Sequence, residues 1–218
     1  GNPPQPAWNN ILSACHKIKS WNILLSKQTF DRIREKFGHQ SSWAVWAEAG
    51  DAPKSNMGDL SIFESDEILR VLNPNVILVG MNIPKDVYLP AFSNFHSKHS
   101  TAQDYKTRFA LKDTELWGGY MTDILKDYPE TKSTTALKYA RSNPEYLEKC
   151  IGTFRDELEA LHSANPLVVA LGGDAYALLK ENLQELQIIK VPHHSRDVSP
   201  GDYRESVLGA LDTYREHH

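Results

Sequence analysis

Two short apolar runs in the chain each end in side chains that can do chemistry. The run at residues 76–79 leads to Asn82, and the run at residues 188–191 leads to His193 and Ser195. An amide can hold a water or a substrate, and an imidazole or a hydroxyl can move a proton or donate a hydrogen bond. Such runs are typical of buried parallel strands, and ligands of open α/β sheets bind outside the carboxyl ends of those strands. Both breaks are therefore candidate sites.

Each of these side chains also has a structural interpretation. An asparagine after a strand is commonly a turn or capping residue, and Asn82 cannot titrate as a general base. Ser195 does not lie in a Gly-x-Ser-x-Gly elbow, so a serine-nucleophile triad is not indicated. His193 fits a structural role and a functional role equally well, the functional one being a hydrogen-bond donor to developing negative charge.

The composition is that of an ordinary globular protein. The 218 residues are 40% hydrophobic and 24% charged, and the formal net charge of −4 neither supports nor excludes a DNA partner. No apolar run approaches the length of a membrane span, and no signal-peptide pattern is present. Cys15 and Cys150 lie far apart in sequence and cannot by themselves hold a structural zinc or an iron–sulfur cluster. We expect a monomer in the reducing cytoplasm, without membrane contact.

Alternating helical and strand patterns predict an α/β protein. Strands are expected at residues 76–79, 120–124, 167–171 and 188–191, and helices over the first forty residues, at 144–162, after 173 and at 200–216. Residues 84–112 are predicted to be irregular. The alternation implies a parallel, doubly wound sheet in a single domain. That domain spans 1–218, with a helical N-terminal part at 1–60 and an α/β core at 70–210.

Several other motifs are expected to be structural. Trp43 and Trp46 are predicted to lie in the core. The pair Gly172-Gly173 favours a tight strand-to-helix turn over a phosphate-binding loop, because neither Gly-x-Gly-x-x-Gly nor a P-loop lysine is present. His96 and His99 have the spacing of a metal pair, but no further Cys or His pattern completes a site. We predict a solvated loop at these two histidines and no metal.

Taken in order, four segments resemble the motifs of the uracil-DNA glycosylase superfamily. Residues 79–84, Val-Gly-Met-Asn-Ile-Pro, resemble its first motif, often Gly-Met-Asn-Pro-Gly. Residues 191–196, Val-Pro-His-His-Ser-Arg, resemble its second, usually His-Pro-Ser-Pro. Residues 120–124 look like the middle strand that normally ends in a base-reading asparagine, and residues 168–175 look like the third strand and its turn. The likeness covers roughly residues 70–210.

This resemblance implies a three-layer α/β/α fold with a four-stranded, mainly parallel central sheet. It also implies a monofunctional DNA glycosylase, which flips a base out of single- or double-stranded DNA and hydrolyses its N-glycosidic bond without cofactor or metal. Asn82 would then position the attacking water, and His193 would donate a hydrogen bond to the departing base. Phe95 is the first choice for stacking on the base, and Phe92 is the second. Ser195 would hold a DNA phosphate.

The resemblance also suggests residues around the flipped base. Arg196 and Val198 are candidates for a wedge in the vacated base stack, and Met81 and Pro84 are expected to line the base. Pro84 leaves room for a ring substituent where strict uracil enzymes carry a bulky tyrosine, and His194 replaces a proline of the second motif.

Asp123 takes the place of the base-reading asparagine. An ionised carboxylate only accepts hydrogen bonds, which suits the exocyclic amine of cytosine and disfavours the carbonyl of uracil. We therefore expect a substituted cytosine as the substrate, with anti-phage defence as a fitting role. The alternatives are an ordinary uracil-DNA glycosylase of base-excision repair, a non-catalytic module that binds modified DNA or a nucleotide, and a hydrolase of free nucleosides or nucleotides.

Overall fold

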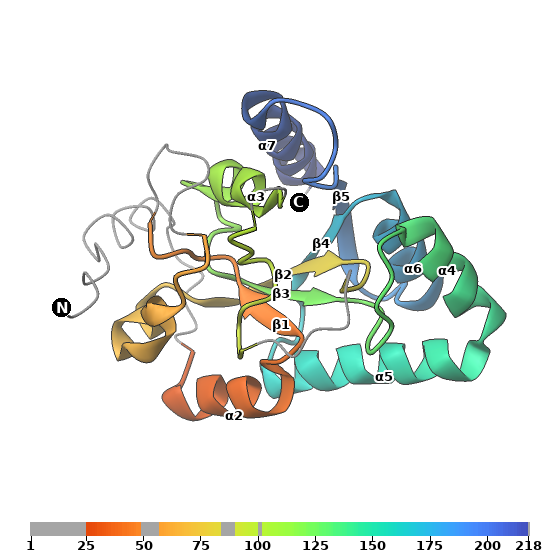
Figure 1. Ribbon diagram of the computed structural model, residues 1–218, viewed down its shortest axis with the longest axis horizontal. Coiled ribbons are helices and arrows are strands. Elements are labelled where there is room, and N and C mark those ends of the chain that lie inside the picture. Colours follow the sequence, from red (N-terminus) through yellow and green to blue (C-terminus); the bar gives the residue numbers. More distant parts are fainter. Residues whose placement is uncertain (1–24, 49–56, 84–89, 100–101, 218) are drawn as a thin grey trace.

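The computed structural model describes residues 25–48, 57–83, 90–99 and 102–217. Its strands form one five-stranded sheet in the order β1-β3-β2-β4-β5 (Figure 1). The strands are β1 (Ser41–Trp43), β2 (Asn73–Gly80), β3 (Gly119–Asp123), β4 (Leu167–Leu171) and β5 (Gln187–Val191). Strands β2, β3, β4 and β5 run parallel to one another. Strand β1 pairs antiparallel with β3 at one edge of the sheet. The predicted α/β class with a mainly parallel sheet is confirmed.

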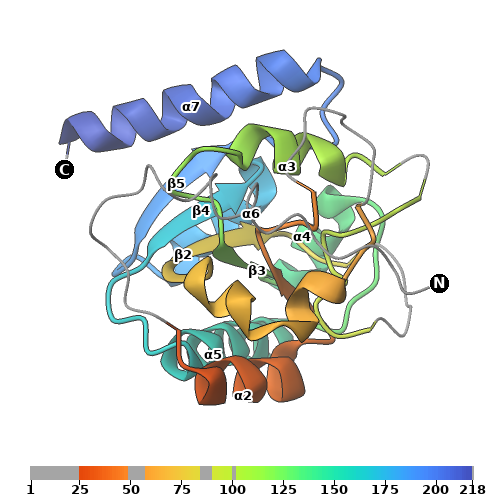
Figure 2. The same cartoon turned by 90° about the vertical axis from the view of Figure 1, so that its left-hand side faces the viewer.

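Six α-helices of the described residues flank this sheet. They are α2 (Lys27–Phe37), α3 (Asp104–Leu111), α4 (Ser133–Ser142), α5 (Pro144–Ala160), α6 (Gly173–Asn182) and α7 (Pro200–His217), and two short 3-10 helices, η1 (Ser61–Glu64) and η2 (Asp66–Arg70), precede β2. Helices α2 and α5 contact each other on one side of the sheet, and α3 and α7 contact each other on the opposite side (Figures 1 and 2). Helix α6 packs on β4 and β5 and contacts α4.

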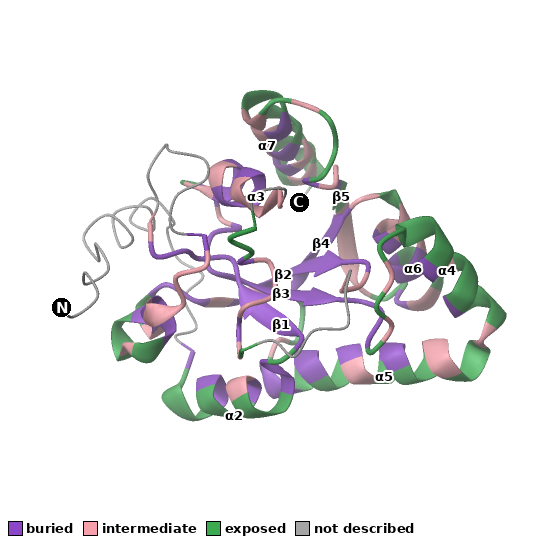
Figure 3. Ribbon diagram, viewed as in Figure 1, coloured by how far each residue is buried: buried purple, intermediate pink, exposed green. Residues whose placement is uncertain are grey.

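The core lies between the strands and the inner faces of these helices. Strands β3 and β4 are buried along their whole length, and β2 is buried over its last five residues (Figure 3). Trp43 and Trp46 are fully buried, as predicted. Helix α5 follows its apolar spacing, with Ile151, Phe154 and Leu158 inward. Burial of apolar side chains between the sheet and the helices supplies the main stabilisation of the fold.

The strand register brings the ends of the parallel strands to one edge. Gly80 pairs with Asp123, and Leu171 pairs with Val191. Beyond the strands, the N–H of Ile124 donates to the carbonyl of Gly80 at 3.0 Å, which ties the segments after β2 and β3 together. The side chains that follow β2, β3 and β5 are thereby gathered at this carboxyl edge.

The structure differs from the expected elements in four respects. The sheet has five strands rather than four, because β1 joins the edge of β3, and this strand lies in the N-terminal part that was expected to be helical. Helix α3 lies in the stretch predicted to be irregular, and helix α4 was not predicted. Helix α3 buries Lys106 and Arg108 along with Ala110 and Leu111, so charged residues interrupt the apolar spacing that would have predicted a helix. The start of the first predicted helix lies outside the described residues.

The predicted tight turn at Gly172 is confirmed, whereas the predicted solvated loop is wrong for His96. Gly172 has a φ of +103°, so the tight turn between β4 and α6 does use the freedom of glycine. His96 does not lie in a solvated loop: it is buried and stacks on Trp46, with its Nε2 2.9 Å from the carbonyl of Val45. Its burial lowers the pKa, which favours the neutral ring. None of the helices in the described parts of the chain is long and apolar enough to span a bilayer.

Candidate functional site

Asp123, Phe95 and Gly80 meet at the carboxyl edge of the sheet. A Cβ placed on Gly80 would collide with Oδ1 of Asp123 and would lie 3.2 Å from Cζ of the Phe95 ring. Glycine at the end of β2 therefore makes room for a carboxyl group and an aromatic ring side by side. The ring is half-buried and packs against the core. A polar group beside an aromatic ring can read the edge of a planar base while the ring covers its face.

Asp123 is held in place by Asn94. Nδ2 of Asn94 donates to Oδ2 of Asp123 at 2.9 Å and to the carbonyl of Gln40 at 3.1 Å. Only 4% of Asp123 is exposed. This burial raises its pKa to about 6, although the Asn94 hydrogen bond and the charge of Lys126 oppose the rise. Asn94 was not predictable from the sequence, because its partner Asp123 lies 29 residues away and no local pattern marks it.

The amide of Asn82 is oriented by three backbone carbonyls. Nδ2 donates to Glu130 at 2.7 Å, to Ile83 at 3.1 Å and to Tyr128 at 3.2 Å. Since carbonyls only accept, the identity of the amide nitrogen is fixed by its surroundings. Within the described residues no hydrogen bond reaches Oδ1 of Asn82. The amide can therefore offer an oriented acceptor to a water molecule.

His193 lies beside Gly172 and is paired with Ser195. The N–H of Ser195 donates to Nδ1 at 3.1 Å, and Oγ of Ser195 lies 2.7 Å from the same atom. A backbone N–H can only donate, so Nδ1 accepts and Nε2 carries the proton of the neutral ring. Burial and the neighbouring His194 lower the pKa of His193 to about 4. The side chain is thus a neutral N–H donor near pH 7.

His194 joins this group to helix α3. Its ring stacks on His193 with 4.2 Å between centroids, and its Nε2 lies 3.2 Å from Oδ1 of Asp104. Oδ2 of Asp104 accepts from the N–H of Ser97, in the segment that carries Phe95. Burial alone would raise the pKa of Asp104, but His194 and the Ser97 N–H together lower it. An ionised carboxylate therefore links the segments of Phe95 and His193.

The two phenylalanine candidates are separated by the fold. Phe92 is fully buried and contacts Phe30 and Phe63, with ring centroids 5.3 and 5.2 Å away. Phe92 therefore belongs to an aromatic cluster of the core, and its buried ring does not fit the role of stacking on a base. Phe95 keeps a partly exposed ring beside Asp123. The choice between two aromatic residues three positions apart is made by packing.

The remaining candidates lie around the loop after β5. Ser195 and Arg196 are exposed, and the carbonyl of Arg196 accepts from Nζ of the buried Lys106 at 3.0 Å. Val198 is half-buried and packs against the core, which leaves Arg196 as the better candidate for a group reaching outward. Met81 is buried, and its backbone carbonyl accepts from Leu125 at 2.9 Å.

Pro84 lies outside the described residues, so its place relative to a base stays a prediction. Among the residues that are described, no three His, Cys, Asp or Glu side chains are grouped as a metal site. The polar groups at the carboxyl edge are instead a buried carboxyl group, an oriented amide and a neutral imidazole. Such groups suit catalysis by fixed dipoles and hydrogen bonds.

Fold and site together define a mixed α/β protein with a polar cluster beyond the ends of its parallel strands. Comparison with protein-family models, with curated proteins and with solved structures found no match for the chain. The resemblance to uracil-DNA glycosylases therefore stays an interpretation of the motifs.

Proposed function

We propose that the protein is a monofunctional DNA glycosylase that removes a modified base and leaves an abasic site. The observation that carries this proposal is the placement of Asp123 and Phe95 side by side over Gly80. Asn82 follows the same strand as Gly80, and His193 follows β5 at the same edge. A base-reading edge, a stacking ring, a water acceptor and a hydrogen-bond donor are the parts that such a reaction needs.

In the proposed reaction, Oδ1 of Asn82 accepts a hydrogen bond from the attacking water. The bond between the sugar C1′ and the base nitrogen breaks, and its electron pair leaves with the base. Nε2–H of His193 donates to the negative charge that develops on the base, without transferring its proton. The water adds to C1′, and its proton is released to solvent. Preorganised donors of this kind act most strongly in the transition state.

The proposed substrate is a substituted cytosine. Oδ2 of Asp123 is occupied by Asn94, so Oδ1 is the atom available to a base. With a pKa of about 6, Asp123 is mainly ionised at pH 7. A carboxylate accepts from the exocyclic amine of cytosine and repels the carbonyl of uracil. Excision of a modified base fits a role in anti-phage defence, and excision of uracil would fit DNA repair.

DNA is the proposed partner, and the cytoplasm is the proposed compartment. Ser195 and Arg196 are exposed on the loop that carries His193, where a phosphate or a base stack can be reached. Cys150 is buried with a free thiol, which agrees with a reducing environment. The protein is proposed to act as a monomer on a single flipped nucleotide.

A panel of DNAs containing uracil, hypoxanthine, cytosine and 5-substituted cytosines tests this function. The measurement is the number of abasic sites formed in a single turnover, detected by strand cleavage in alkali. The expected result is release of a substituted cytosine by the wild type and not by Asn82→Ala. Binding of modified DNA without cleavage would instead indicate a non-catalytic module. Cleavage of free nucleosides alone would indicate a nucleoside hydrolase.

A further inference from the structure

The segment of residues 126–130 is the support on which the amide of Asn82 rests. The carbonyls of Tyr128 and Glu130 both accept from Nδ2 of Asn82. The backbone of Asp127 has a φ of +54°, in the left-handed region that is uncommon for non-glycine residues and that aspartate enters more readily than most. A conformation of this kind persists where the surrounding structure holds it, and such residues gather at functional sites.

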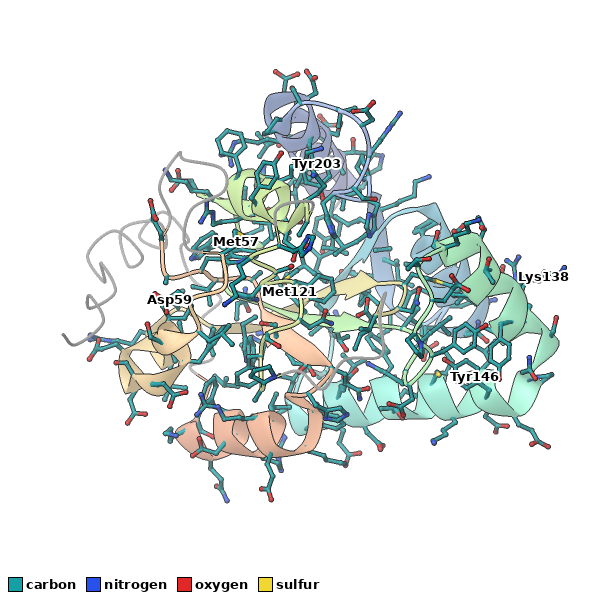
Figure 4. All side chains as sticks on the ribbon, viewed as in Figure 1. Met57, Asp59, Met121, Lys138, Tyr146 and Tyr203 are labelled. Carbon is teal, nitrogen blue, oxygen red and sulfur yellow. The ribbon has the colours of Figure 1, made fainter. Side chains whose placement is uncertain are left out.

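Three tyrosines hold this segment. The ring of Tyr128 stacks on Tyr139 of helix α4, with 4.1 Å between centroids and 9° between planes. Tyr146 of helix α5 packs against both rings, at 5.3 Å from Tyr139 and 6.0 Å from Tyr128. Its hydroxyl donates to the carbonyl of Lys126 at 2.8 Å. Tyr146 lies where α5 meets α4 (Figure 4). The segment is thus fixed at its start by a hydrogen bond and near its middle by a stack.

We propose that Tyr128, Tyr139 and Tyr146 are positioning residues for Asn82, and that Tyr139 connects helix α4 to the reaction. This inference rests on the proposed function, because it assigns a use to the orientation of Asn82. Each contact in the series joins the next: Tyr139 to the Tyr128 ring, the Tyr128 carbonyl to Nδ2, and Nδ2 to the orientation of Oδ1. Loss of the first contact is expected to loosen the last, while the Tyr146–Lys126 hydrogen bond continues to hold the start of the segment.

Tyr139 is suited to a test because its ring lies at the surface. It is 37% exposed, so its removal leaves no closed cavity in the core. Tyr139→Phe retains the aromatic stack and serves as the conservative variant. Tyr214→Ala is a matched control: it removes a tyrosine from helix α7 whose hydroxyl donates to Gln187. Gln187 is the first residue of β5, so this contact lies at the end of the strand opposite to His193.

The first measurement uses the free protein and needs no substrate. The side-chain amide resonances of Asn82 are assigned in a ¹⁵N spectrum by their loss in Asn82→Asp. In the wild type and in Tyr139→Phe we expect slow hydrogen exchange of this amide. In Tyr139→Ala the exchange should quicken by about tenfold or more, because the carbonyls of residues 128 and 130 no longer stay in place. Unchanged exchange in Tyr139→Ala would overturn the proposal.

The second measurement is the single-turnover excision rate on the substrate found by the base panel. Tyr139→Ala should lower the rate on the order of tenfold to a hundredfold, as expected for a misplaced catalytic group. The DNA dissociation constant of Tyr139→Ala should equal that of the wild type. Tyr139→Phe, which keeps the aromatic stack, should excise the base at the wild-type rate. An equal loss in Tyr214→Ala would reduce Tyr139 to a general contribution to folding and refute the inference. Absence of excision by the wild type would contradict the proposed function and, with it, the link from Tyr139 to the reaction. The exchange measurement would still decide separately whether the tyrosines orient the amide of Asn82.

Discussion

Asn94 donates a hydrogen bond to one carboxylate oxygen of Asp123, at 2.9 Å, and leaves the other oxygen beside the ring of Phe95. Among the described residues no side chain donates to that second oxygen, which is the atom proposed to accept from a base. Replacing the carboxylate of Asp123 with the amide of asparagine keeps the shape of the side chain and adds a hydrogen-bond donor.

Asp123→Asn should therefore shift the preference from substituted cytosine towards uracil. An amide can turn its NH₂ group to the carbonyl of uracil, which a carboxylate repels. A hydrogen-bonding pair of this kind discriminates bases by about 1–3 kcal/mol, so the ratio of the two excision rates should move by about tenfold or more. The check is a competition assay on duplexes that differ in one base. Equal ratios in the two proteins would mean that Asp123 does not read the base.

The same preference should depend on pH. Burial raises the pKa of Asp123 to about 6, so the carboxylate prevails above that pH and the protonated acid prevails below it. The protonated acid can donate to a carbonyl, so discrimination against uracil should weaken as the pH falls from 8 to 5. Rates are measured for both bases across this range. Asp123→Asn is the control and should show a flat ratio, and a flat ratio in the wild type would contradict the assignment.

His193→Ala should slow base release while leaving DNA binding nearly intact. The proposed partner of Nε2–H is charge that appears only in the transition state, and loss of one such donor typically lowers the rate on the order of a hundredfold to a thousandfold. Because the pKa of His193 is lowered to about 4, its ring stays neutral and no rate change from its protonation is expected between pH 6 and 8. Single-turnover rates and a binding titration check both statements. An unchanged rate would make His193 structural.

Arg196→Ala should weaken binding to all DNA sequences by a similar factor. The side chain is exposed, while the loop backbone is held independently by Lys106. If Arg196 contacts one phosphate, the slope of log K against log salt should become shallower by about one. Binding is titrated at several salt concentrations. A slope equal to that of the wild type would show that Arg196 does not neutralise a phosphate.

The buried ion pair of Lys126 and Glu157 should matter for stability. Nζ of Lys126 lies 2.9 Å from Oε2 of Glu157. The Glu157 side chain is fully buried, and its Oε1 accepts from the hydroxyl of Thr122. Lys126→Met would leave the carboxylate without its cation and should lower the free energy of unfolding by about 3–5 kcal/mol. The double variant Lys126→Met/Glu157→Leu should recover much of this loss. Urea unfolding measures both, and a loss below about 1 kcal/mol in Lys126→Met would contradict the expectation.

Elements with a regular pattern were predictable from the sequence. The apolar runs of β2 and β4 and the spacing of α5 report burial directly, because one strand or one helix face is enough to create the pattern. The run of β5 also predicted a buried strand, but β5 lies at the edge of the sheet and of its five residues only Val191 is buried. Strand β1 has only three residues, and α3 buries charged side chains along with apolar ones. Both elements depend on partners that are remote in sequence, such as β3 for the first and the Arg196 carbonyl for the second.

The sequence by itself also determined the residue types that end the strands, among them Asn82, Asp123 and His193. Only the tertiary structure decided how each is placed and what it contacts. Packing buries Phe92 in the core and leaves Phe95 beside Asp123. Hydrogen bonds from distant segments orient the amide of Asn82 and hold the carboxylate of Asp123. Local sequence sets which groups are available, whereas burial and partner geometry, which set pKa and orientation, arise only when remote segments come together.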